Sequence, residues 1–333
     1  MLEFLKHKVV QAPMAGITTP ALAAAVSNAG GLGSLGLAAL DAATAREAMA
    51  QTRALTDRPY GVNLFCHRPP RRSAATEKAW LARLAPHFRA YGADTPAGLR
   101  DNYRSLLDYD EMLEAVIDAR PGVVSFHFGL PRPDQLEALR GSGAVLLATA
   151  VGPQDAETIA AAGLDGIVAQ GWEAGGHRGL FDENGADDRL GVLDLLATLR
   201  PVGLPLIAAG GIMTREDVRA VLDAGAIAAQ CGTAFLVADE AATSPAHRAA
   251  LGAGETRMTR AVSGRPARAV LNKISEMVEE GAPDYPLPYS ATKALNAAAL
   301  AQGETGFGPH WAGGRCDLAQ PGSAAEILAR LAP

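Results

Sequence analysis

Apolar and β-branched runs of strand length alternate along the chain with Ala/Leu-rich segments of helical spacing. These runs predict eight strands, with helices between most of them. The predicted strands cover 8–13, 31–35, 60–65, 123–128, 145–150, 166–170, 205–209 and 226–231, and the predicted helices include 20–29, 42–54, 108–119, 153–162, 190–199 and 215–224. This order indicates an α/β fold, a (β/α)8 TIM barrel of parallel strands. A doubly wound open sheet is the alternative.

Two stretches interrupt the alternation, 66–107 after the third strand and 237–333 after the eighth. Segments that follow barrel strands lie at the catalytic mouth, so we expect both to be insertions that form lids or extra helices there. A single domain of 1–333 is therefore predicted. Three predicted helices end on small residues followed by Gly30, Gly163 and Gly225, which indicates left-handed C-terminal caps.

Composition and charge narrow the function. Of the 333 residues, 48% are hydrophobic and 20% charged, which is enough to bury a core. The formal net charge of −6 leaves no basic field for nucleic acid, and the short run HRPPRR at 67–72 does not outweigh it. The three widely spaced cysteines indicate a reducing cytoplasm without a disulfide framework or structural zinc site. No signal peptide or membrane span is expected, and the histidines show no metal-ligand spacing.

The stretch 170–179, QGWEAGGHRG, directly follows a short buried strand. Its glycines let the backbone approach a flat ligand closely, and His177 can be held over that ligand. We interpret this stretch as part of an active site with His177 as the catalytic residue. The alternative is a turn that merely contains a histidine.

Glycines also stand at the ends of the seventh and eighth strands, as Gly210 and Gly211 and then as Gly232 before Thr233. Backbone N–H groups there can bind a phosphate without lysine or arginine, and barrels often place a phosphate at this position. The alternative is that the glycines only form tight turns. The neighbouring Cys231 lies inside an apolar strand, which favours buried packing over a nucleophilic role.

Two amides at strand ends point to a ring-shaped ligand. Asn63 and Gln170 are costly to bury unless they meet a polar ligand or a backbone group. Together with segment 11–16 and His177 they are typical of a flavin mononucleotide (FMN) pocket. Each amide could equally be satisfied within the core.

Several segments then resemble one family in order along nearly the whole chain. They are QAPMAG with TPALAAAVSNAGGLGSLG, PYGVNLF, VVSFHFGLP, GWEAGGHRG, PLIAAGGI and QCGTAFL. They are similar to the nitronate monooxygenases, formerly 2-nitropropane dioxygenases, which are FMN enzymes with a TIM-barrel fold. The tail PDYPLPYSATK resembles their class I members. In WAGGRCDLAQ, Gly314 stands where the family usually has glutamine.

The resemblance assigns roles to residues of this chain. It implies FMN contacts from Met14, Ala15, Gly16, Asn63, Gln170, Gly175, Gly211, Gln230, Cys231, Gly232 and Thr233, catalysis by His177, and substrate contacts from Tyr109, Tyr285, Tyr289 and Lys293. It also implies that a nitronate reduces FMN and that O2 is then reduced, giving a carbonyl compound and nitrite. We expect no metal ion in the site. We expect the protein to be a monomer or a homodimer.

The residues agree with this chemistry, because a nitronate anion needs cationic or hydrogen-bonding groups at its oxygens. Tyr289 and Lys293 share one face if their segment is helical, which favours a substrate with a second anionic group such as propionate 3-nitronate. The alternative for Lys293 is a solvated position on an amphipathic helix. Two other functions remain open: an NAD(P)H-dependent flavin reductase acting on a quinone or on enoyl-acyl carrier protein, and a phosphate- or flavin-binding protein without turnover.

Overall fold

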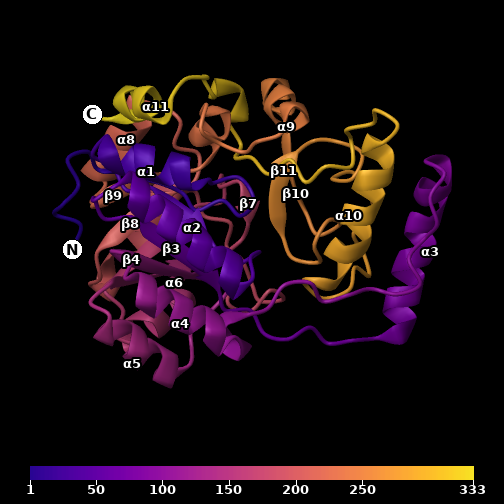
Figure 1. Cartoon of the computed structure of the whole chain (residues 1–333), viewed down its shortest axis with the longest axis horizontal. Helices are drawn as coiled ribbons and strands as arrows, with labels where there is room; N and C mark the ends of the chain where they lie inside the picture. The colour runs from indigo at the N-terminus through magenta and orange to yellow at the C-terminus, as the bar shows by residue number, and fades with distance from the viewer.

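Eight parallel strands form the centre of the computed structural model, which describes residues 1–333 (Figure 1). In pairing order they are β1 (Val9–Gln11), β9 (Ala228–Cys231), β8 (Leu206–Ala209), β6 (Gly166–Gln170), β5 (Val145–Ala150), β4 (Val123–His127), β3 (Gly61–Phe65) and β2 (Ser34–Gly36). A parallel bridge between Val10 and Leu32 joins the two ends of this sheet, where Gln11 N donates to Leu32 O at 2.8 Å. The sheet therefore closes on itself, and the predicted strands and barrel are confirmed.

A helix follows each strand on the outside of the barrel. These helices are α1 (Pro20–Asn28), α2 (Ala42–Leu55), α4 (Asp110–Ala119), α5 (Pro133–Gly141), α6 (Pro153–Ala161), α7 (Val192–Leu199), α8 (Arg215–Asp223) and α11 (Ala324–Leu331). The sequence pattern had not singled out α5. Helix α11 packs against α1 and α8, so the end of the chain belongs to the barrel wall rather than to the mouth. Gly30, Gly163 and Gly225 have φ of +96°, +69° and +98°, which confirms the predicted left-handed caps.

Apolar side chains close the barrel at the amino ends of its strands. Inward-facing Val123, Leu147 and Val168 cluster there with Leu2 and Leu5 from the N-terminal segment. A separate and larger cluster fills the space between the strands and the surrounding helices. Because one end is filled in this way, the barrel can hold a ligand only at the carboxyl ends of the strands.

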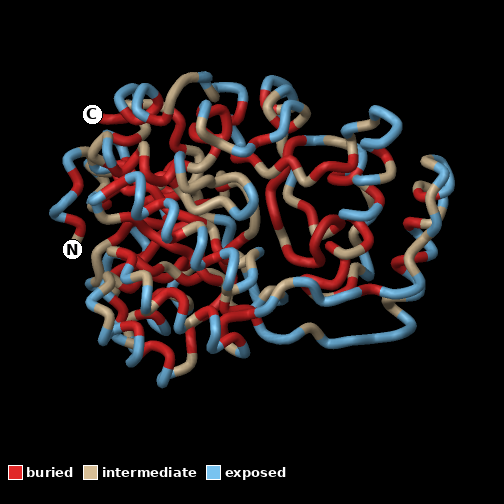
Figure 2. The backbone as a smooth tube through the Cα atoms, in the orientation of Figure 1, coloured by how far each residue is buried: buried red, intermediate tan, exposed pale blue.

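A second lobe stands beside the barrel and is built from both interrupting segments (Figure 1). It contains α3 (Ala74–Ala90), α9 (Pro245–Ala250), β10 (Thr256–Thr259), β11 (Ala267–Val270) and α10 (Leu287–Leu300). Its own apolar cluster joins Trp80 and Phe88 of α3 to Leu287 and Leu295 of α10. Figure 2 shows buried backbone running through the barrel and through the β-strands of this lobe.

The short strand β7 (Gly176–His177) ties the lobe to the barrel. It follows β6 in the chain but pairs with β11 of the lobe, where His177 faces Ala267 in an antiparallel register. The lobe thus fixes the backbone of the residue that the sequence singles out as catalytic. No helix combines the length and apolar composition needed to cross a membrane.

Candidate active site

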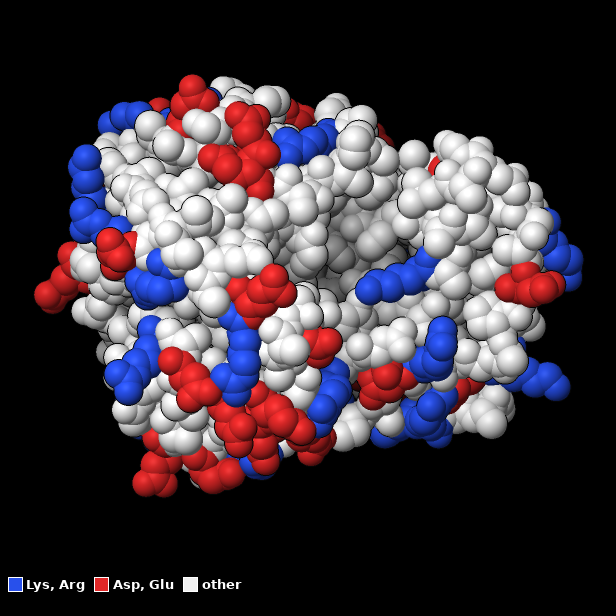
Figure 3. Space-filling view, viewed as in Figure 1, with Lys and Arg blue, Asp and Glu red and all other residues white.

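A cavity of about 390 Å³ opens between the barrel and the lobe. Figure 3 shows it as a hollow with a basic side chain at its edge. Loops at the carboxyl ends of the strands form one wall, and α10 with the segment around Trp311 forms the other. The proposed site residues that line it are Met14, Ala15, Gly16, Asn63, Gln170, Gly175, His177, Gly210, Gly211, Gln230, Gly232, Thr233, Tyr289 and Lys293. The structure therefore brings together residues that lie up to 279 positions apart in the chain, from 14 to 293.

One end of the cavity is lined by backbone N–H groups. Those of Gly175, Gly211 and Gly232 donate to no other backbone carbonyl of the protein. Arg315 lies at the same end, where its guanidinium pairs with Asp217 at 2.7 Å and stays partly exposed. Free N–H donors with a nearby cation suit a phosphate group.

The glycine positions differ in what they require. At Gly175 a Cβ atom would lie 2.4 Å from the carbonyl carbon of Ala312, so only glycine allows this close backbone approach. At Gly232 a Cβ would meet Ala12 Cβ at 3.4 Å and Met14 Sδ at 3.8 Å, which are ordinary contacts. Gly314 has open space around it, and its N–H donates to Glu173 O at 3.0 Å. The departure from the family pattern at Gly314 thus leaves this backbone tie in place.

The two amides behave differently from one another. Gln170 Nε2 donates to His177 O at 2.9 Å, and Gln170 Oε1 accepts from Gly179 N at 2.9 Å. Gln170 is therefore satisfied within the protein, and it holds the loop that carries His177. Asn63 Nδ2 donates to Ser125 Oγ at 2.9 Å, and its oxygen is left for a ligand. A polar atom of this kind can read the edge of a ring.

His177 stands at the centre of the cavity wall. Its Nε2 lies 2.9 Å from Ser263 Oγ, and its carbonyl oxygen also accepts from His127 Nε2 at 3.2 Å. Its ring centroid is 5.2 Å from that of Trp311 and 6.0 Å from that of Tyr289. Burial holds the pKa of His177 well below its usual range, and the positive charge of Arg265 adds to this effect. The imidazole is neutral near pH 7 and can accept a proton.

Lys293 and two tyrosines form the opposite end of the cavity. The exposed Lys293 follows Tyr289 by one turn of α10, and its ammonium contacts Tyr103 Oη. Lys293 Nζ lies 4.7 Å from the centre of the Tyr103 ring and 5.5 Å from that of Tyr289. Burial raises the pKa of Tyr289 above its usual range, so its hydroxyl stays protonated. This end offers an ammonium and two phenols to an anion.

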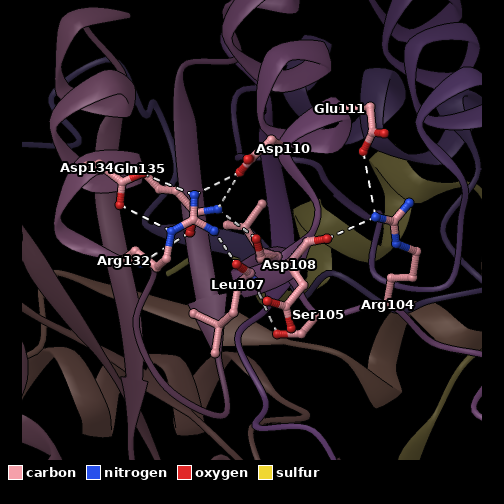
Figure 4. A network of polar contacts seen from close by, with 10 residues as sticks. Arg104, Ser105, Leu107, Asp108, Asp110, Glu111, Arg132, Asp134 and Gln135 are labelled. Atoms are coloured by element: carbon pink, nitrogen blue, oxygen red, sulfur yellow. Dashed lines mark hydrogen bonds and ion pairs between the residues drawn. The ribbon is translucent and has the colours of Figure 1, made fainter.

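Tyr109 does not lie at the substrate side, and this prediction is wrong. Its hydroxyl accepts from Ala42 N at 2.9 Å, and its ring is buried in the cluster between strands and helices. Arg132 holds the turn around Tyr109 by a hydrogen bond to Leu107 O and an ion pair to Asp110 at 2.9 Å, and Asp134 of α5 pairs with the same guanidinium at 3.0 Å (Figure 4). The anchored turn directs Tyr109 into the barrel wall.

We expect Tyr109→Phe to leave catalytic turnover unchanged within about twofold. Losing the hydroxyl leaves Ala42 N without its partner, so the free energy of unfolding should fall by about 1 kcal/mol. Urea denaturation and steady-state kinetics measure the two effects. A large change in KM with unchanged stability would instead return Tyr109 to the substrate site.

Two other proposed residues lie outside the cavity surface. Tyr285 is buried in the lobe cluster behind His177, with its ring centroid 5.6 Å from that of the imidazole. Cys231 is buried in the barrel wall, and burial raises the pKa of its thiol to about 12. Cys231 is therefore a packing residue, as its apolar strand indicates, and its side chain makes no cavity contact.

Among the cavity residues that escaped the sequence analysis are Tyr103, His127, His247, Trp311 and Arg315. His127 ends β4, so its place at the carboxyl end of a strand was a usable signal. Burial lowers its pKa to about 3, which keeps it neutral. The other four lie in the loops and helices of the long connections, where hydrophobic periodicity does not indicate which way a side chain points.

The closed barrel with a cavity at the carboxyl ends of its strands defines an α/β-barrel enzyme, and free backbone N–H groups and a histidine line that cavity. A family model described as nitronate monooxygenase matches residues 1–333, and the chain belongs to this family of flavin-dependent oxidoreductases. It is therefore an enzyme that oxidises nitronates.

Individual relatives agree with this assignment. The nitronate monooxygenase of Paraburkholderia phytofirmans is 50% identical over 97% of this chain and 90% of its own length. The nitronate monooxygenase of Pseudomonas aeruginosa is 45% identical over 98% of this chain and 95% of its own. The crystal structure of nitroalkane oxidase from Streptomyces ansochromogenes superposes with a TM-score of 0.91 at 38% identity, over 99% of this chain and 95% of that one. FabK from Thermotoga maritima, at 24% identity and a TM-score of 0.72 over 98% and 92%, shares the fold alone.

Proposed function

We propose that this enzyme binds FMN and uses O2 to oxidise nitronates, including the carboxylated propionate 3-nitronate, to a carbonyl compound and nitrite. The observation that carries the proposal is one continuous cavity that joins free glycine N–H groups at one end to His177, Tyr289 and Lys293 at the other. A phosphate-bearing ring fits this order of groups, with the anionic substrate between the ring and the lobe.

The residues present fit FMN. The N–H groups of Gly211 and Gly232 would hold its phosphate, with Arg315 beside them, and the free oxygen of Asn63 would accept from the ring edge. When bound, FMN supplies the electron acceptor for the nitronate. The protein supplies no redox group of its own in the cavity.

The side chains around the substrate bind and orient it. Tyr289 and Lys293 would hold its anionic groups, and Trp311 and Tyr103 form the wall of the lobe. The neutral imidazole of His177 would orient a nitronate by a hydrogen bond to its nitro group, and from a neutral nitroalkane it would accept the α-proton and so form the nitronate. Deprotonating a neutral nitroalkane is the task for which a neutral base is suited.

Mixing without O2 tests which compound donates electrons to the flavin. The purified protein is mixed without O2 first with a nitronate and, separately, with NADH, while the flavin absorbance is followed. Bleaching or a radical spectrum with the nitronate alone supports the proposal. Bleaching with NADH alone would establish a nicotinamide-dependent reductase instead.

The phosphate site is tested by Gly232→Val. The backbone at Gly232 has φ of −104°, which any residue adopts, and an added Cβ atom would meet only ordinary contacts in the protein. We expect the Kd for FMN to rise about tenfold or more, because the side chain occupies the space of the phosphate, while the Kd for riboflavin stays unchanged. Fluorescence titration of the apoprotein measures both constants.

Gly211 is less suitable for this test. A Cβ atom there would lie 2.9 Å from Glu173 Cβ, on a backbone with φ of +68°. Replacing Gly211 would therefore strain the protein itself, whether or not a ligand is bound.

Equal weakening of FMN and riboflavin binding by Gly232→Val would contradict the assignment of the phosphate to this end of the cavity.

A further inference from the structure

Trp311 connects the lobe to the substrate end of the cavity. Its indole Nε1 donates to Tyr289 Oη at 3.2 Å, and its ring lies beside that of His177. The backbone of Trp311 is fixed on two sides. His247 Nε2 lies 3.1 Å from its carbonyl oxygen, and an antiparallel bridge joins Trp311 to Ala269 of β11. The indole therefore approaches Tyr289 from a fixed direction.

The direction of this hydrogen bond determines what Tyr289 can do. An indole N–H only donates, so the oxygen of Tyr289 must accept from it. A phenol has one hydrogen, and burial keeps that hydrogen on Tyr289. With the indole on its acceptor side and no other protein partner for the hydroxyl, the O–H of Tyr289 is left to point into the cavity. An anion there needs a donor and is repelled by lone pairs.

We propose that Trp311 is a positioning residue that fixes the hydroxyl of Tyr289 as a donor toward the anionic substrate. The inference rests on the proposed function for the identity of the anion. His247 supports this arrangement by holding the peptide of Trp311, and the ring of His310 stacks on His247 at 5.1 Å. Nothing in the arrangement requires Trp311 to touch the reacting atoms.

The variant Trp311→Phe tests the proposal because it keeps an aromatic ring beside His177 and removes the N–H, together with part of the indole ring system. We expect KM for a nitronate to rise about tenfold, with kcat within about twofold of the parent and unchanged flavin content. The matched control is Trp80→Phe. Trp80 is buried in the lobe, and its Nε1 has no hydrogen-bond partner. Its replacement should leave KM unchanged.

A double-mutant cycle with Tyr289→Phe separates positioning from general damage. If Trp311 acts through the hydroxyl, Trp311→Phe adds no further loss once that hydroxyl is gone. Losses that multiply in the double variant would overturn the proposal, as would an unchanged KM in the single variant.

A second measurement does not depend on turnover. Nitrite, an inert anion, is titrated into the flavin-loaded protein, and its Kd is read from the flavin absorbance. We expect Trp311→Phe and Tyr289→Phe to weaken nitrite binding equally, and equal Kd values in parent and Trp311→Phe would overturn the proposal. If the parent fails to oxidise nitronates, the proposed function fails, while the nitrite titration still decides the role of Trp311.

Discussion

Replacing His177 with Asn is expected to lower kcat for nitronate oxidation about 100-fold or more, while the flavin stays bound. This is the usual scale for removing a positioned acid, base or electrostatic group. The loop should keep its place, because its hydrogen bonds from Gln170 and His127 go to the backbone carbonyl of His177 rather than to the ring. Stopped-flow absorbance measurements without O2 give the rate at which the nitronate reduces the flavin.

The pH dependence of the parent enzyme follows from the environment of His177. Burial holds the pKa of His177 well below the ordinary value of 6.5, so the neutral form persists as the pH falls through that value. An enzyme that needs the neutral imidazole should therefore show no loss of kcat/KM near pH 6.5 and should lose activity only in more acidic solution. An inflection near 6.5 would mean that another group controls the rate.

A matched variant distinguishes the ring of His177 from its surroundings. Ser263→Ala removes the hydroxyl 2.9 Å from Nε2 and keeps the imidazole, so its loss of kcat should be smaller, on the order of tenfold. If the His177→Asn variant binds a full complement of flavin and keeps a near-normal kcat, His177 has only a structural role in β7.

The barrel and most of the cavity could be predicted from the sequence because strand ends carry positional information. In a barrel of parallel strands every carboxyl end lies at the same mouth, so Asn63, Gln170 and the glycines after β8 and β9 had to converge there. The direction of a side chain within a strand could also be predicted, because successive side chains point to opposite faces. Gln230 faces the cavity, and the adjacent Cys231 faces the helices.

The long connections could not be predicted in the same way. Tyr103 and Tyr109 lie six positions apart after β3, and contacts such as the ion pair of Arg132 with Asp110 and the hydrogen bond from Ala42 N hold Tyr109 in the barrel wall. These contacts come from segments distant in the sequence. For the same reason the sequence alone could not place the indole of Trp311 against Tyr289.

The role of Lys293 can be tested by comparing two substrates. A charge-assisted hydrogen bond contributes about 1.5 to 3 kcal/mol, so Lys293→Met should lower kcat/KM for propionate 3-nitronate roughly 10- to 100-fold. An alkyl nitronate without the carboxylate should lose much less. The physical reason is the position of the ammonium at the cavity rim, beside Tyr103 and one turn beyond Tyr289, where it can reach the far end of a substrate held at His177.

Lys273→Met is the control for a general effect of charge. Lys273 is also an exposed lysine of the lobe, but it pairs with Glu304 and does not line the cavity, so its loss should change kcat/KM for neither substrate. If Lys293→Met weakens both nitronates equally, the ammonium binds the nitro group that they share rather than the carboxylate. If neither substrate is affected, Lys293 is a solvated residue of α10, and the proposed contact with a substrate carboxylate is wrong.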